Sequence, residues 1–230
     1  MGSGHSAQVQ AVATAKPVDA EYSVLVAGST GACGKALVSQ HLQDPNCTRV
    51  IALTRRPIDD IRTVFAEGDL DKLTVKQVDY DNLQSADISK EKATVAVCAL
   101  GSAPYSEESD YVVPCKFATY CKELGIKSMI LVSAAGSSKG SILGYVDTLG
   151  RREEFFRNAQ FDKCIILRPK LLLRHELART KEVVFDYLTP SSQKIDVADV
   201  ARAAVTALSR DWPGNILSLE HADLLDISKV

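Results

Sequence analysis

The chain has 230 residues, of which 46% are hydrophobic and 24% charged, and its formal net charge is -2. This length predicts one domain, and the composition is typical of a globular protein rather than of a disordered one. The charge balance lacks the basic excess of a dedicated nucleic-acid binder, and no apolar run in the sequence is long enough to cross a bilayer. We therefore expect neither a nucleic-acid partner nor a membrane span.

Residues 1–20 are predicted to form a loosely held tail. The first residues, Met-Gly-Ser-Gly-His, look like a cloning remnant, and those that follow are small, polar and aperiodic. The rest of the chain, 21–230, is predicted to be a single domain. The six cysteines contain no C-x-x-C pair and follow no secretory signal, so we expect reduced thiols in a cytoplasmic protein and no metal site.

From residue 22 onward, short β-branched runs alternate with amphipathic stretches. The predicted strands are Tyr22–Ala27, Arg49–Thr54, Lys72–Val78, Thr94–Ala99, Ser128–Val132 and Lys163–Leu167. Helical patterns lie near 32–43, 59–66, 109–124 and 145–159. Strands joined by helical crossovers predict an α/β fold, a Rossmann-type doubly wound parallel sheet with helices on both faces.

The alternation weakens beyond Pro169. We expect a helical piece near 181–188, a helix over Val197–Ser209 that Asp196 opens, a short strand at Ile216–Leu219 and a terminal helix. A part this small is predicted to be a substrate-side cap rather than an independent domain.

The strongest local signal is the turn that follows the first predicted strand, where Gly28, Gly31 and Gly34 stand at three-residue spacing and a helix begins. In dinucleotide-binding folds the first glycine permits a tight turn. The second lets the backbone approach a pyrophosphate, and the third lets the helix pack against the strand. Free N–H groups at the helix start meet the phosphate charge. The alternative is a glycine-rich turn without a ligand.

The second predicted strand ends in Arg55 and Arg56. In dinucleotide-binding folds the end of this strand contacts the adenosine ribose, and an acidic residue there favours NAD. Arginine pairs with phosphate in a bidentate way, so two arginines favour NADP and its 2′-phosphate. Two solvated surface arginines are the alternative interpretation.

Two further strand ends carry candidate cofactor contacts. Asp79 follows the third strand, where its carboxylate either accepts from the adenine amino group or caps a helix. Gly101 follows the fourth strand, where a small residue lets the backbone approach the cofactor.

The candidate catalytic pair is Ser133, at the end of the fifth strand, and Tyr145, at the start of the next helix. In a carbonyl reductase the serine hydroxyl polarises the carbonyl and the tyrosine transfers the proton. A lysine four residues after the tyrosine lowers the phenol pKa, but that position is Leu149. Arg152 and Lys139 are the candidate substitutes for this cation. Alternatively, the serine and tyrosine are a structural inheritance.

Together these residues resemble the atypical short-chain dehydrogenase/reductase superfamily, and within it the Tat-interacting oxidoreductase family and its fungal mitochondrial relatives. The resemblance runs from about Val24 to Ser228. Its motifs are Gly28-Ser-Thr-Gly-Ala-Cys-Gly34, Leu53-Thr-Arg-Arg56, Val78-Asp-Tyr80, Cys98-Ala-Leu-Gly101, Leu131-Val-Ser-Ala-Ala-Gly136, Gly144-Tyr145, Leu167-Arg-Pro169 and Leu224-Leu-Asp-Ile-Ser228.

The resemblance implies a role for each matching position. The pyrophosphate would lie against Gly28, Thr30, Gly31 and Cys33, and the 2′-phosphate would lie against Arg55 and Arg56. Asp79 would contact the adenine. Leu100 and Gly101 would contact the ribose, and Leu171 would contact the nicotinamide. Ser133 and Tyr145 would be catalytic. Leu149 departs from the family lysine, and Lys170 from the glycine that follows Arg-Pro. Some members are regulators, and some associate with mitochondrial outer membranes.

Two functions remain open at this stage. In the first, the chain is an NADP(H)-dependent reductase of a small carbonyl compound, with catalysis weakened at Leu149. In the second, it is a catalytically silent, NADP(H)-bound regulatory module that presents a surface to a protein partner. A nucleotide-sugar or isoflavonoid-type enzyme would need a larger substrate domain than this chain offers.

Overall fold

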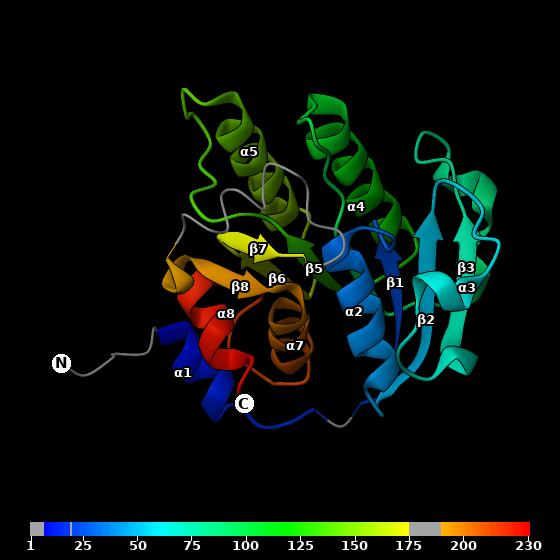
Figure 1. The fold of residues 1–230 in the computed structure, drawn as a ribbon, viewed down its shortest axis with the longest axis horizontal. Coiled ribbons are helices and arrows are strands. Elements are labelled where there is room, and N and C mark those ends of the chain that lie inside the picture. Colours follow the sequence, from blue (N-terminus) through cyan, green and yellow to red (C-terminus); the bar gives the residue numbers. More distant parts are fainter. Residues whose placement is uncertain (1–6, 19, 175–189) are drawn as a thin grey trace.

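The computed structural model describes residues 7–18, 20–174 and 190–230. Its centre is a parallel sheet in the order β3-β2-β1-β4-β5-β6-β9 (Figure 1). The strands are β1 Tyr22–Ala27, β2 Cys47–Thr54, β3 Leu73–Gln77, β4 Val95–Cys98, β5 Ser128–Val132, β6 Lys163–Arg168 and β9 Ile216–Glu220. The chain builds outward from β1 in one direction and then, from β4, in the other. The crevice between β1 and β4 is where such sheets bind ligands.

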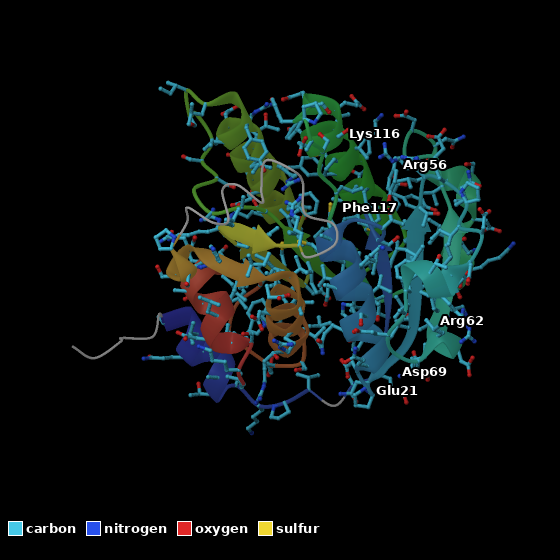
Figure 2. All side chains as sticks on the ribbon, viewed as in Figure 1. Glu21, Arg56, Arg62, Asp69, Lys116 and Phe117 are labelled. Atoms are coloured by element: carbon cyan, nitrogen blue, oxygen red, sulfur yellow. The ribbon has the colours of Figure 1, made fainter. Side chains whose placement is uncertain are left out.

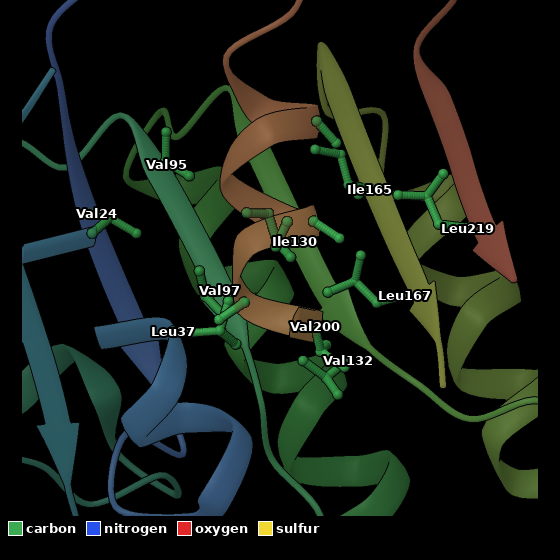
Figure 3. Packing of buried hydrophobic residues seen from close by; sticks show 14 of the residues in the cluster. Val24, Leu37, Val95, Val97, Ile130, Val132, Ile165, Leu167, Val200 and Leu219 are labelled. Atoms are coloured by element: carbon green, nitrogen blue, oxygen red, sulfur yellow. The ribbon is translucent and has the colours of Figure 1, made fainter. Parts of the chain in front are cut away.

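Helices cover both faces of the sheet. One face carries α2 (Ala32–Gln43) and α7 (Val197–Leu208), and the other carries α4 (Val113–Glu123) and α5 (Gly144–Asn158). Successive residues of each strand point to opposite faces, so Val24 belongs to one core and Leu25 to the other. Figure 3 shows the first core, in which strand valines and isoleucines meet Leu37 of α2 and Val200 of α7.

The predicted strands all form, within two residues of the expected bounds, and the first predicted helix matches α2. The expected helix over 59–66 is reduced to one turn, α3 (Ile61–Val64). The expected helix over 109–124 begins as a π-helical turn over Glu108–Val112 and becomes α4 where Pro114, which has no N–H, stands in the first turn. Short 3₁₀ turns lie at Leu70–Lys72, Leu83–Ala86, Ile88–Glu91 and Ser191–Gln193.

Most of the described C-terminal part completes the main sheet instead of forming a cap. Strand β9 pairs with β6, and α7 packs beside α2. Asp196 opens α7 as predicted, since its carboxylate accepts from the N–H of Ala198 at 2.9 Å. The cap is represented by β7 (Leu171–Leu173) and β8 (Lys194–Asp196), which form a small separate sheet, and α8 (His221–Ile227) ends the chain. The expected helical piece near 181–188 lies outside the described residues.

The expectation of a loosely held tail is wrong for residues 7–18. Helix α1 (Ala7–Thr14) buries Val9 and Val12 in the same core as α7 and α8. These valines are three residues apart and lie on one helix face, a pattern too short to recognise in the sequence. Main-chain hydrogen bonds from Val18 to Ser209 and from Asp211 to Lys16 hold the segment that follows.

Within the described residues, no helix combines the length and the apolar character that crossing a membrane requires.

Replacing Val12 by alanine tests the role of α1. Because the side chain is fully buried, we expect Val12→Ala to lower the free energy of unfolding by about 1–3 kcal/mol, measured by denaturant titration. Gln10→Ala, an exposed position on the same helix, should leave stability unchanged. Equal stability of both variants and the wild type would mean that residues 7–14 do not support the fold.

Candidate functional site

The glycine turn between β1 and α2 is shaped by close backbone packing. Gly28 has a φ of +77°, and a Cβ there would lie 2.5 Å from the carbonyl oxygen of Ala99. A Cβ at Gly34 would lie 2.0 Å from the carbonyl oxygen of Gly28. Both positions therefore require glycine, one for the turn and its approach to β4, the other for the contact of α2 with the turn.

Gly31 has a different reason to be glycine. A Cβ there would meet protein only at 3.4 Å, the carbonyl oxygen of Gly28, so the protein itself leaves room for a side chain. Gly31 is the N-cap of α2 and offers no side chain to accept from the N–H groups of the first turn. These donors and the helix dipole favour an anionic group at this place.

Cys33 stands in the first turn of α2, where burial raises the pKa of its thiol to about 11. The thiol is therefore neutral near pH 7 and adds no negative charge beside the helix start. Thr30, which the resemblance also assigns to the pyrophosphate, is exposed and lines neither pocket described below.

A pocket of about 820 Å³ opens over the carboxyl ends of β1 to β4. It brings together residues that the sequence places far apart. The predicted ones among its lining residues are Gly28, Gly31, Arg55, Asp79, Leu100 and Gly101. Gly34 lies beneath them, buried against the turn.

The two predicted arginines differ in position. Both are exposed, but Arg55 lines the larger pocket and Arg56 does not belong to its lining. Figure 2 shows Arg56 at the end of β2, on the outer surface. Asp79 is exposed at the pocket wall, and its carboxylate accepts from the N–H of Asp81 at 2.9 Å. It thus caps a turn while facing the pocket, so the two alternatives for this residue are compatible.

Sequence reasoning missed the role of Tyr80. Its hydroxyl accepts from the N–H of Gly28 at 3.3 Å, and burial raises its pKa above the ordinary value. The protonated phenol fixes the first residue of the glycine turn. The alternation that buries Val78 and Tyr80 together was visible in the sequence, but the partner of the hydroxyl was not.

A second missed residue, Asp110, shapes the loop after β4. Its buried carboxylate accepts from the N–H of Ser102 at 3.2 Å, from the Ser102 hydroxyl at 2.6 Å and from the N–H of Ser106 at 3.0 Å. The loop that carries Gly101 is thereby held in one conformation.

A smaller pocket of about 250 Å³ adjoins the larger one and shares Gly31, Leu100 and Gly101 with it. Ser133, Tyr145, Leu149 and Leu171 line this smaller pocket, as does Cys33. The structure therefore brings the predicted catalytic pair and the predicted nicotinamide contact together at one end of a continuous site.

The hydroxyl of Ser133 is already engaged as a donor. It donates to Oε1 of Glu153 at 2.6 Å, and Glu153 is only 2% exposed. Arg168 donates to the same carboxylate from Nε at 3.0 and 3.1 Å, which holds the carboxylate in place. The Ser133 oxygen can accept a hydrogen bond in this arrangement, but its proton points to Glu153. No sequence signal identified Glu153.

Tyr145 is 45% exposed, and its ring meets that of Tyr105 edge to face at 5.6 Å. Leu149 is buried one helical turn further on. Of the two substitute cations, Lys139 is paired with Glu154 at 2.6 Å and lines neither pocket. Arg152 does line the smaller pocket, but its Nη atoms donate to the carbonyl oxygens of Leu100 and Val132.

Comparison with known proteins agrees with this geometry. A protein family described as NAD(P)H-binding matches residues 28–211. The chain is 27% identical over 228 residues to the mitochondrial protein FMP52 of Lodderomyces elongisporus, covering 89% of this chain and 96% of that protein. It is 26% identical over 223 residues to protein HTATIP2 of Rattus norvegicus, covering 90% and 89% of the two chains.

The fold is also that of solved dinucleotide complexes. The Bordetella bronchiseptica enzyme WbmG, in complex with NAD and UDP, superposes with a TM-score of 0.64 at 13% identity, covering 92% of this chain and 79% of the enzyme. This likeness confirms the predicted Rossmann-type fold. The family match and the two relatives confirm the predicted resemblance, and the chain belongs to the NAD(P)H-binding family of atypical short-chain dehydrogenases/reductases.

Proposed function

We propose that the chain binds NADP(H) along the two joined pockets and acts as a nucleotide-bound regulatory module, with little carbonyl reduction. The observation that carries this proposal is the hydrogen bond from Ser133 to the buried carboxylate of Glu153. A hydroxyl that donates to a charged acid cannot donate to a substrate carbonyl at the same time.

The residues present fit a dinucleotide. The pyrophosphate would meet the N–H groups that Gly31 leaves uncapped at the start of α2. The adenosine would occupy the larger pocket beside Asp79, and the nicotinamide would enter the smaller pocket beside Leu171. When bound, the nicotinamide supplies or accepts hydride; the protein binds and orients it.

Arg55 supports a preference for the phosphorylated cofactor. It stands at the end of β2 and lines the larger pocket, where the adenosine ribose lies in folds of this type. Its guanidinium complements a 2′-phosphate through charge-assisted hydrogen bonds, an interaction that NADH cannot make.

The proton donor is equally poorly equipped for efficient reduction. Tyr145 lines the same pocket as Ser133, but the buried Leu149 occupies the position from which a lysine would acidify its phenol. Because the two hydroxyl residues do share one pocket, slow NADP(H)-dependent reduction of a small carbonyl compound is the second candidate function.

Arginine variants test the cofactor preference. Arg55→Ala should weaken NADPH binding by about 1.5–3 kcal/mol, or roughly 10- to 150-fold, and change NADH binding little. Arg56→Ala, at the neighbouring position outside the pocket lining, is the matched control and should have a smaller effect on NADPH. Titration with both cofactors measures this. Equal weakening of NADPH and NADH by Arg55→Ala would rule out the 2′-phosphate contact.

Tyr80→Phe tests whether the hydroxyl holds the glycine turn for the dinucleotide. Loss of one neutral hydrogen bond should weaken NADPH binding about 2- to 10-fold. Tyr120→Phe alters another buried tyrosine of the same core that lines neither pocket, and it should leave NADPH affinity unchanged. If the two variants bind NADPH equally, the Gly28–Tyr80 contact has no part in cofactor binding.

Turnover distinguishes the two candidate functions. With NADPH and a panel of small aldehydes and ketones, we expect a kcat at least about 100-fold below the roughly 10 s⁻¹ typical of enzymes. The reason is that the Ser133 hydroxyl donates to Glu153 and that Tyr145 lacks the lysine that would lower its pKa. Tyr145→Phe should bind NADPH as the wild type does. An ordinary kcat that disappears in Tyr145→Phe would replace the regulatory function with the reductase.

A further inference from the structure

Among the described residues, the lining of the smaller pocket carries more cationic than anionic side chains, an excess that the nicotinamide does not require. Three cationic residues line it: Arg152, Lys170 and Arg174. Among its described lining residues, Asp110 is the one acidic side chain. The larger pocket has the opposite balance, with Arg55 against Asp79, Asp81 and Glu108.

The single carboxylate of Asp110 offsets only part of the charge of the three cations. Its two carboxylate oxygens accept from the N–H of Ser102, the hydroxyl of Ser102 and the N–H of Ser106. Among the described residues it forms no ion pair with Arg152. Its role is to hold the loop after β4, as described above.

Among the described residues, the hydrogen-bond partners of the buried Arg152 side chain are main-chain carbonyl oxygens. The side chain is 2% exposed, and its Nη atoms donate to the carbonyl oxygens of Leu100 at 3.1 Å and Val132 at 3.0 Å. Its Nε has no hydrogen-bond partner in the part of the chain that the structure describes. A buried guanidinium without a counter-charge is costly, and an anionic group in the adjoining pocket would offset that cost.

Lys170 places a second cation at this pocket. Its main-chain N–H donates to Nδ1 of His221 at 3.2 Å, while Nε2 of the same ring faces the carbonyl oxygen of Ser192 at 3.2 Å. The imidazole therefore ties Lys170 to the start of α8. The Lys170 side chain is exposed, and in the described residues its ammonium forms no ion pair.

We infer that the smaller pocket binds, beside the nicotinamide, a small ligand that carries a carboxylate or phosphate group, with Lys170 as its direct contact and Arg152 as the charge behind it. This inference rests on the proposed dinucleotide site and names the ligand class of its nicotinamide end. The nicotinamide and this ligand would share a volume of about 250 Å³, which limits the ligand to a molecule of a few non-hydrogen atoms.

The dinucleotide's own pyrophosphate is the other source of negative charge. Arg174 lines this pocket together with Cys33, which stands in the first turn of α2, so Arg174 lies near the place where the pyrophosphate would bind. We therefore assign Arg174 to the pyrophosphate, which leaves Lys170 and Arg152 as the cations for a second anion. The main chain of Lys170 is bound to the start of α8 instead. Replacing Lys170 therefore distinguishes a second anionic ligand from the pyrophosphate of the dinucleotide.

Calorimetric titration with malonate, at low ionic strength and with and without saturating NADP⁺, tests the inference. Malonamide, of the same size but uncharged, is the control ligand, and inorganic phosphate is the second anionic probe. We expect malonate or phosphate to bind and malonamide not to bind. Lys170→Met should weaken the anion about tenfold or more, and Lys170→Arg should retain it. Lys139→Met, which removes a lysine outside both pockets, should change nothing.

The outcomes separate this inference from the proposed function. NADP⁺ affinity should stay within about twofold in Lys170→Met; a loss equal to that of the anion would assign Lys170 to the dinucleotide and overturn the inference. No binding of either anion to the NADP⁺-loaded wild type would also overturn it. If NADP⁺ fails to bind but malonate binds in a Lys170-dependent way, the proposed cofactor site is wrong and the anion site stands.

Discussion

The close contact of α2 with the turn that follows β1 is the constraint on which the rest of the site depends. Gly34 lets the helix approach the carbonyl of Gly28, and Gly28 in turn lies against the backbone of Ala99 after β4. These contacts leave no room for a β-carbon at either glycine. They fix the uncapped start of α2 over the crevice between β1 and β4, where the two pockets meet.

A second constraint acts in the smaller pocket, where the buried carboxylate of Glu153 accepts the hydrogen bond that the Ser133 hydroxyl can donate. Glu153 accepts from Ser133 and is held by Arg168, which also pairs with Glu220 at 2.7 Å. The fold thus keeps the architecture of an NAD(P)H-binding protein and directs the serine proton to a buried carboxylate. Together with Leu149, this arrangement supports the proposed function, in which the chain binds NADP(H) and catalyses little reduction.

The parts of the structure that were predictable from the sequence rest on local signals. Buried strands read as β-branched runs, and the glycine spacing with a helix behind it placed α2 to the residue. Helix α1 was missed because two valines are too few to show a period. Arg55 and Arg56 are equivalent candidates in the sequence, but both lie in the bend after β2, and Arg55 lines the larger pocket whereas Arg56 does not.

The residues that sequence reasoning missed act through partners distant in the chain. Tyr80 reaches Gly28, and Glu153 reaches Ser133, across separations of 52 and 20 residues. Nothing in the residue types or their spacing specifies such pairs, because the sheet order and the helix orientation bring them together. The same holds for the buried charge of Arg152, which in the sequence is one arginine of a charged helix.

The most direct test of this account is a calorimetric titration of the wild-type protein with NADPH and with NADH. We expect one NADPH bound per chain, with NADPH binding more tightly than NADH, because the glycine turn would bind the pyrophosphate of both cofactors and Arg55 would bind the 2′-phosphate, which NADPH alone carries. Binding of neither cofactor would contradict it, since the turn would then be architecture without a ligand. Equal binding of both would contradict the place given to Arg55.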